Sequence, residues 1–404
     1  PPPPPPAAPP PAPPQPYTVL TSSAASDVYK RQASAFVCFS GYAGYLSDRY
    51  HKRTIVIACK VAEIAVMSLG LLVFMAIGTG SASLITFLFF VLFLMGVQSA
   101  FFGPSKYGIL PEMFSEFDLP TVNGAVLGTT FLAIIYGTAL AGILKDMLGS
   151  QIWLISLLCV CLAIAGTITS LLVRKTPPAQ PGLRFSPSSI FVEPKIWKRV
   201  FADRTLFKVL LVYSVFWFVG GVVALAITLT GQVQLGLTAT VTSLFNASMG
   251  LGIGLGSVVA AKVSKNQVRL GLVRLGSVGL FLGMLGVAVV AVSPIDSSIK
   301  SWLIGSFLFA AGIFGGLVAI PLQVFIQTHP PAELKGRVIA LMNLMTWVGI
   351  LMASVYYIAV LAMTGFKMDP SWILLSCGVI MLVASVLANL KTKDLVGTDP
   401  VSQV

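Results

Sequence analysis

Long hydrophobic runs recur along this chain from residue 33 onward, and short polar segments separate them. A helix needs roughly 20 apolar residues to cross the hydrocarbon core of a bilayer, so each run predicts a membrane-spanning helix. We identify eleven runs, at residues 33–47, 54–77, 84–103, 122–144, 151–173, 207–229, 238–262, 269–292, 301–324, 337–363 and 370–389. The pattern therefore predicts an all-α polytopic membrane protein.

The first run is short for a membrane span. Its fifteen residues, at ~1.5 Å each, cover ~22 Å of a ~30 Å core. Residues 1–16 are almost all Pro and Ala, and the chain begins with Pro rather than Met. Residues 22–32 look like translated adapter sequence at the edge of an assembly, so we treat residues 1–32 as non-native. We expect a first helix and part of the second to be missing, and expect transport only from a version that carries them.

Positive charge is distributed unevenly between alternate loops. One set of loops carries most of the Lys and Arg residues, whereas the other holds Lys145, Lys300 and Lys367. The excess of positive charge marks the first set as cytoplasmic. Its longest member, the basic and Pro-rich loop 174–206, predicts a linker between two helix bundles, at 33–173 and 207–390. Residues 391–404 form a polar tail.

Composition supports a lipid environment and argues against most other classes. The chain is 56% hydrophobic and 10% charged, with a mean hydropathy of +0.90, whereas soluble domains carry roughly 25% charged residues. The net charge of +12 lies in separate short loops rather than on one face, so we expect no nucleic-acid partner. The histidine and cysteine patterns predict no metal site and no disulfide, and no phosphate-binding loop is present. We therefore expect a membrane protein without cofactor or catalytic residues.

The segment 44–53 has the most distinctive loop sequence, Gly-Tyr-Leu-Ser-Asp-Arg-Tyr-His-Lys-Arg. An ordinary positive-inside loop would explain the charges alone. The spacing G-x-L-S-D-R-x-x-K-R also resembles the loop between the second and third helices of major facilitator superfamily transporters. That resemblance implies two six-helix halves and a gate in which the Asp caps a helix end and pairs with basic residues. The gating residues it implies here are Gly44, Asp48, Arg49, Lys52 and Arg53.

A second resemblance rests on the block 103–142, which reads Gly-Pro-Ser-Lys-Tyr-Gly-Ile-Leu-Pro-Glu at its start. The block is similar to the bacterial lysophospholipid transporter family, which also forms the N-terminal membrane domain of bifunctional acyltransferase/acyl-carrier-protein synthetases. The resemblance covers roughly residues 36–390. It implies movement of lysophospholipids such as lysophosphatidylethanolamine across the bacterial inner membrane, followed by re-acylation. The implied partners are the lysophospholipid substrate, membrane lipids and an acyltransferase/acyl-carrier-protein synthetase.

Glu63 is the strongest single candidate for substrate binding or proton coupling. It lies ten residues after Arg53, or ~15 Å along a helix, near the middle of the membrane. Ionisable groups at that depth are costly and usually face a cavity or a partner. Lys60, three residues earlier, lies on the same helix face, so a local ion pair is the alternative interpretation.

Four further polar residues are candidates. Lys106 follows Gly103-Pro104, where a broken turn would present its ammonium to a phosphate, although snorkelling to lipid explains it equally well. Gln98, Asn123 and Gln323 lie within or beside apolar runs and contact either substrate or another helix. The repeated glycines of 250–256 predict close helix packing rather than a nucleotide site.

Three other functions remain open at this stage. The chain is compatible with an efflux permease of the same fold that exports drugs or other amphiphiles. It is also compatible with the membrane domain of a fusion whose acyltransferase lies beyond Val404. A membrane scaffold without transport activity is the remaining alternative.

Overall fold

The computed structural model describes residues 34–76, 82–148, 151–185, 187–190, 192–264, 268–364 and 368–390. Residues 1–33 and 391–404 lie outside this part, so the expectations for the N-terminal segment and the tail are not addressed by it. Within it, a helix over residues 34–49 precedes the helices α2–α13. Their bounds are α2 Lys52–Ala76, α3 Ala82–Gly108, α4 Leu110–Met113, α5 Leu119–Leu148, α6 Trp153–Ser170, α7 Pro194–Ala202, α8 Arg204–Leu229, α9 Ala239–Ser264, α10 Gly271–Val292, α11 Ser297–Thr328, α12 Lys335–Met363 and α13 Pro370–Ala388.

The helices confirm the predicted all-α membrane architecture. Ten of them within the described residues are long and apolar enough to cross a bilayer. They correspond to the predicted runs from 54–77 onward, and the run 33–47 falls on the helix over residues 34–49. Several helices extend beyond the apolar run that predicted them. For example, α11 begins at Ser297 because the Asp296 carboxylate accepts hydrogen bonds from the first free backbone N–H groups.

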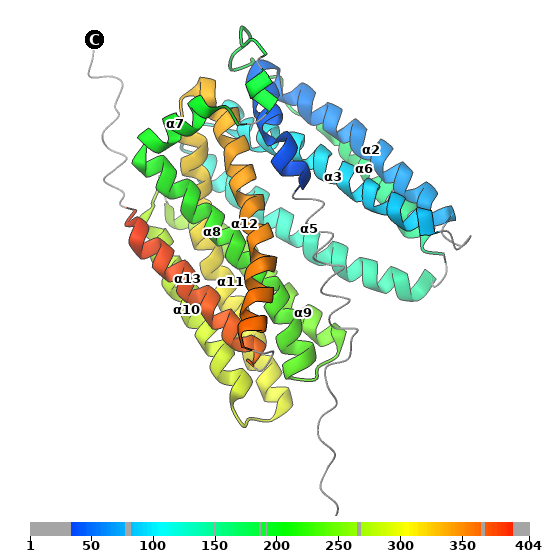
Figure 1. Ribbon diagram of the computed structural model, residues 1–404, viewed down its shortest axis with the longest axis vertical. Coiled ribbons are helices and arrows are strands. Elements are labelled where there is room, and N and C mark those ends of the chain that lie inside the picture. The colour runs from blue at the N-terminus through cyan, green and yellow to red at the C-terminus, as the bar shows by residue number, and fades with distance from the viewer. Residues whose placement is uncertain are drawn as a thin grey trace, which may run out of the picture.

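The helices pack as two groups along the chain (Figure 1). On one side α2 packs against α3 and α6, and on the other α8 packs against α12 and α13 while α10 packs against α11 and α13. The groups meet where α5 packs against α9 and α11, and where α3 packs against α12. The main hydrophobic core lies within the second group and is built mainly from α8, α10, α11, α12 and α13.

The glycine repeat in α9 packs closely against neighbouring helices, as its sequence predicts, with Gly252 and Gly256 facing α11. A Cβ on Gly252 would collide with the backbone carbonyl of Phe309, and one on Gly256 would collide with that of Ile313. The two backbones therefore approach more closely than any larger residue would allow. This packing leaves the repeat without a role in nucleotide binding.

Two local expectations need correction. The segment 174–206 is not loop throughout, because Pro194–Ala202 forms α7, with Pro194 in the first turn where its missing N–H costs nothing. The turn at Pro104 is also not broken: α3 continues through this proline to Gly108 and carries Lys106 in its last turn.

Candidate functional site

Asp48, near the end of the helix over residues 34–49, joins the two groups of helices by bonding to the start of α12. Its Oδ1 accepts a hydrogen bond from the Gly336 backbone N–H at 2.8 Å, and its Oδ2 accepts from the Arg337 N–H at 3.2 Å. The Arg337 Nε also donates to Oδ2, at 2.9 Å. The N-cap residue of α12, Leu334, makes no side-chain cap, and the Asp48 carboxylate caps this helix from another part of the chain.

Close backbone packing surrounds this cap. A Cβ on Gly44 would lie 2.7 Å from the Ala340 Cβ and 3.1 Å from the Arg337 Cα. A Cβ on Gly336 would collide with the Asp48 carboxylate. The helix over residues 34–49 and α12 therefore touch through glycine surfaces, and we call this junction the α12 contact.

Among the described residues, the hydrogen bonds and ion pairs of the other predicted gating residues lie within their own group of helices. Lys52 is fully buried, and its Nζ forms an ion pair with Glu112 of α4. Arg53 donates to the Leu171 carbonyl at 2.6 Å, at the end of α6. Arg49 donates to a tyrosine hydroxyl one turn back in its own helix. These three residues brace the loop that carries Asp48, whereas Gly44 and Asp48 touch α12.

The linker between the two groups of helices, residues 174–206, also contacts Arg337 of α12. The Gln180 Oε1 accepts from the Arg337 Nη2 at 3.0 Å, and the Gln180 N–H donates to the Asp48 carbonyl at 2.8 Å. Glu193 lies 3.8 Å from the Arg337 Nη1. The linker thus contacts both partners of the α12 contact, which no motif in the sequence indicated.

Burial raises the pKa of the Asp48 carboxyl to about 6, although Arg337 and Lys52 act in the opposite direction. If the α12 contact opened to water, the carboxyl would return toward its usual 3.8. The closed contact therefore binds the proton more tightly, so acid stabilises it and this stabilisation is lost as the pH rises through about 6.

We expect the closed population to grow as the pH falls from 7 to 5, by up to about tenfold per pH unit below the raised pKa. Spin labels at Tyr50 and Glu333, both exposed and on opposite sides of the contact, report the distance. Asp48→Asn should remove most of this pH dependence. A pH profile that is unchanged in this variant would assign the titration to another group.

A polar cluster lies on α2 and α3, among apolar spans. The Lys60 Nζ donates to the Glu63 Oε2 at 2.8 Å, which is the local ion pair that the spacing allowed. The Gln98 Nε2 donates to the same Oε2 and to the Cys59 carbonyl, both at 3.2 Å. Lys60 and Glu63 each keep 23% of the side chain exposed, so the pair remains accessible.

Lys106 lies on the same side of α3 as this cluster. Its Nζ is 5.2 Å from the centre of the Tyr107 ring and 6.0 Å from that of Phe102, and the Lys60 Nζ is 5.3 Å from the Phe102 ring. Within the described residues no carboxylate forms an ion pair with Lys106. Phe102 thus stands between two ammonium groups, of which Lys106 is the one without an acidic partner.

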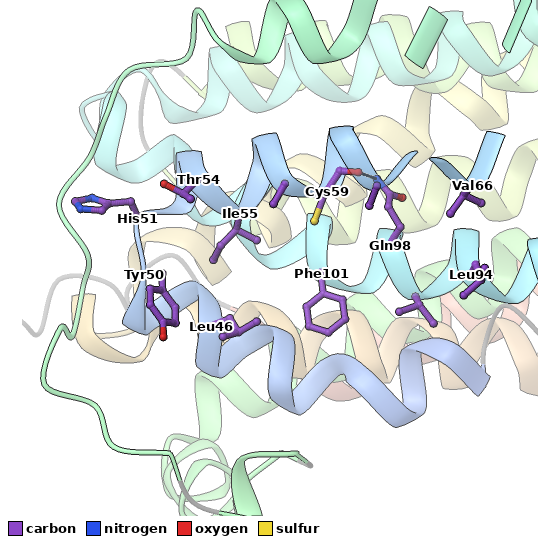
Figure 2. Close-up of a pocket in the computed structure, with 13 residues that line it drawn as sticks. Leu46, Tyr50, His51, Thr54, Ile55, Cys59, Val66, Leu94, Gln98 and Phe101 are labelled. Atoms are coloured by element: carbon purple, nitrogen blue, oxygen red, sulfur yellow. Dashed lines mark hydrogen bonds between the residues drawn. The ribbon is translucent and has the colours of Figure 1, made fainter. Parts of the chain in front are cut away.

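Two adjoining cavities open beside the cluster. The smaller, of about 220 Å³, is lined by Glu63, Gln98 and Ser99 together with apolar side chains. The larger, of about 540 Å³, lies between α2, α3 and the helix over residues 34–49 and is almost entirely apolar (Figure 2). Gln98 and Val66 line both cavities, so the polar cluster lies where they meet.

The remaining candidates, Asn123 and Gln323, pair with other helices. The Asn123 Nδ2 donates to the Gln327 Oε1 at 2.6 Å, and the Gln327 Nε2 donates back to the Asn123 Oδ1 at 3.0 Å, joining α5 to α11. One turn earlier on α11, the Gln323 Oε1 accepts from the Tyr213 hydroxyl at 2.6 Å. All of these side chains are buried. Because Asn123 of α5 pairs with Gln327 of α11, it lies between the two groups of helices.

Asn123→Ala should lower the thermal midpoint by several degrees, because it leaves the buried Gln327 amide without its partner at a cost of about 1–3 kcal/mol. Differential scanning fluorimetry of the purified protein measures this effect. Thr129→Ala on the same helix is the control, because the Thr129 hydroxyl is exposed and bonds only within α5. Equal midpoints for the two variants would show that the amide pair contributes nothing.

The family model described as the Major Facilitator Superfamily matches residues 31–354. The chain belongs to the major facilitator superfamily. It is therefore a multi-pass membrane transporter, and this membership agrees with the loop motif around Asp48. Its family is one of secondary transporters rather than enzymes.

Characterised relatives share much of the length of this major facilitator chain. The lysophospholipid transporter LplT of Klebsiella pneumoniae subsp. pneumoniae is 28% identical over 337 residues, which cover 81% of this chain and 77% of that protein. LplT of Cronobacter sakazakii is 32% identical over 262 residues, covering 62% and 61%. In fold, the chain resembles a bacterial homologue of the iron transporter ferroportin in its outward-facing state. That structure has a TM-score of 0.68 at 15% identity, with 93% of this chain and 94% of that chain covered.

Several residues of this major facilitator site were not assigned from the sequence. Glu112 pairs with Lys52, Gln180 and Glu193 contact Arg337 of the α12 contact, and Gln327 completes the amide pair. Each partner of these residues lies between 60 and 204 positions away in the chain. Local spacing contains no signal for such pairs.

Proposed function

We propose that this transporter moves lysophospholipids such as lysophosphatidylethanolamine across the bacterial inner membrane, so that they are re-acylated on the cytoplasmic side. Two observations of different kinds support this proposal. Relatives that cover most of the chain are named lysophospholipid transporters. The single structural observation that carries it is the polar cluster at the junction of two cavities, one of which is apolar.

The shape and chemistry of the cluster suit an amphiphile with one acyl chain. The apolar cavity of about 540 Å³ accommodates part of a hydrocarbon tail. Lys60 and Lys106 offer ammonium groups to a phosphate, and Glu63 offers a carboxylate to an ethanolamine ammonium. Gln98 donates to Glu63 and faces both cavities, which places it between the proposed headgroup and tail positions.

We further propose that residues 33–173 and 207–390 act as two moving halves, and that the α12 contact closes the cytoplasmic end. With the cytoplasmic end closed, the substrate-binding site would be open only to the outer leaflet. Breaking the contact of Asp48 with α12 would then allow release toward the inner leaflet. The linker residues Gln180 and Glu193 would move with Arg337 during this exchange.

Ligand-dependent thermal stability tests the choice of substrate. Lysophosphatidylethanolamine, added below its critical micelle concentration, should raise the thermal midpoint of the purified transporter, because a ligand that binds only the folded state stabilises it. A monoacylglycerol with the same acyl chain lacks the phosphate and should raise it far less. Stabilisation by a cationic drug but not by the lysolipid would instead support an efflux permease.

A further inference from the structure

The short helix α7 lies at the end of the bundle where α8 and α12 begin (Figure 1). Ile196 and Val200, one turn apart, are 3% and 0% exposed and belong to the main hydrophobic core. One face of α7 is thus packed against the protein, and the opposite face is left to the surroundings. Helix α7 is not among the candidate spans of the described residues, and it belongs to the basic linker that the positive-inside rule assigns to the cytoplasmic side.

The exposed side of α7 and the start of α8 are strongly basic. The exposed basic residues of this segment, which we call the basic face, are Lys195, Lys198, Arg199, Arg204 and Lys208. Within the described part of the chain, none of them forms an ion pair with a carboxylate. Five cations between residues 195 and 208 therefore lack an ion-pair partner within the described residues.

The two acidic residues of the segment bond to groups other than its basic residues. The Glu193 Oε1 accepts from the Ser189 hydroxyl at 2.7 Å, and Glu193 also lies 3.8 Å from Arg337. The Asp203 Oδ1 accepts from the Leu206 N–H at 2.9 Å, and its Oδ2 lies 2.7 Å from the His329 Nε2. Both carboxylates lie at the ends of α7 and bond to groups outside the basic face, and within the described residues neither forms an ion pair with it.

Aromatic side chains border the basic face. Phe201 is 55% exposed, and its ring centre lies 5.6 Å from that of Trp197 and 5.0 Å from that of Phe207. Aromatic rings next to Lys and Arg are typical of protein surfaces at the level of lipid headgroups. An acidic soluble partner would complement the charges but would not account for the exposed ring of Phe201.

We propose that α7 and the first turns of α8 form a binding surface for anionic phospholipid headgroups of the cytoplasmic leaflet. The phosphodiester oxygens accept hydrogen bonds from the basic face, while the exposed Phe201 inserts at the level of the ester groups. The surface lies away from the polar cluster on α2 and α3. It does not depend on the protein transporting lysophospholipids.

Native mass spectrometry of the purified full chain tests the surface. The protein is incubated with equal amounts of phosphatidylglycerol and phosphatidylcholine with identical acyl chains, and the ratio of the two bound lipids is measured. The wild-type protein should retain phosphatidylglycerol preferentially. Each basic residue near an anionic surface contributes roughly fivefold to binding. Lys195→Gln/Lys198→Gln/Arg199→Gln should therefore lower the ratio at least about tenfold.

Arg174→Gln/Lys175→Gln/Arg184→Gln is the matched control, because these exposed basic residues belong to the same linker and lie outside α7, and the substitutions remove the same number of charges. The control should change the ratio less than about twofold, and high salt should weaken the wild-type preference by screening the charges. Equal retention of the two lipids by the wild-type protein would overturn the proposal. This is the result expected if the basic face binds an acidic protein instead of lipid. An equal drop in the control would overturn it as well, because the effect would then follow total charge rather than α7.

Discussion

Gly44→Val should reduce transport about tenfold or more, because it forces the helix over residues 34–49 away from α12. A side chain on Gly44 would begin 2.7 Å from the Ala340 Cβ and 3.1 Å from the Arg337 Cα, and the second of these is a backbone atom that has little room to yield. Overpacking of this kind costs roughly 1–3 kcal/mol, or about 5-fold to about 160-fold in a conformational equilibrium. A transporter that cannot close its cytoplasmic end cannot complete an alternating cycle.

The state of the α12 contact can be measured separately from transport. Ser47 is fully buried beside Asp48, so a cysteine at this position, in a background without the five native cysteines, should react with a soluble maleimide only when the contact opens. Gly44→Val should make this cysteine reactive. Gly220→Val is the control, since a Cβ on Gly220 meets nothing within 4 Å. Protection of Ser47→Cys in the Gly44→Val protein would contradict the packing argument.

Glu63→Gln should reduce lysophospholipid transport at least about tenfold at normal expression, because it removes the carboxylate that two donors share. The Lys60 ammonium would then face an apolar environment without its ion-pair partner, 2.8 Å away in the present structure. Glu116→Gln is the matched control, because Glu116 is exposed in the loop before α5. Wild-type transport by Glu63→Gln would rule out a direct role for this residue.

The double variant Lys60→Gln/Glu63→Gln separates a structural ion pair from a substrate contact. If Glu63 only neutralises Lys60, removing both charges should restore transport, since no unpaired charge remains. If the two groups bind the headgroup, as we propose, the double variant should stay inactive while folding normally. Transport rates in proteoliposomes and thermal midpoints, measured on the same preparations, distinguish the two outcomes.

The sequence predicted the spans well because a membrane helix depends mainly on the length and apolarity of one continuous run. The same local reasoning found the ion pair between Lys60 and Glu63, three residues apart on one helix. It failed for α7, whose nine residues lie in a Pro-rich segment. The signal was present, since Ile196 and Val200 are one helical turn apart and follow Pro194.

The partners of the gate could not be predicted from spacing at all. Asp48 and Gly336 are 288 positions apart, and Asn123 and Gln327 are 204 apart. The resemblance of the loop implied that Asp48 caps a helix, but only the packing of the helices shows that α12 is that helix. Polar residues inside spans are costly without partners, so the sequence indicated that Asn123 and Gln323 needed partners without showing which.

Translocation of lysophosphatidylethanolamine by the full-length protein in proteoliposomes tests the central claim most directly. Fluorescent lysophosphatidylethanolamine is placed in one leaflet, and its arrival in the other is followed by chemical quenching. We predict that translocation exceeds that of protein-free vesicles and that diacyl phosphatidylethanolamine is not translocated. We also predict that translocation is lost in Glu63→Gln but kept in Glu116→Gln. Equal rates for the wild-type and protein-free vesicles, with a cationic drug transported instead, would contradict it.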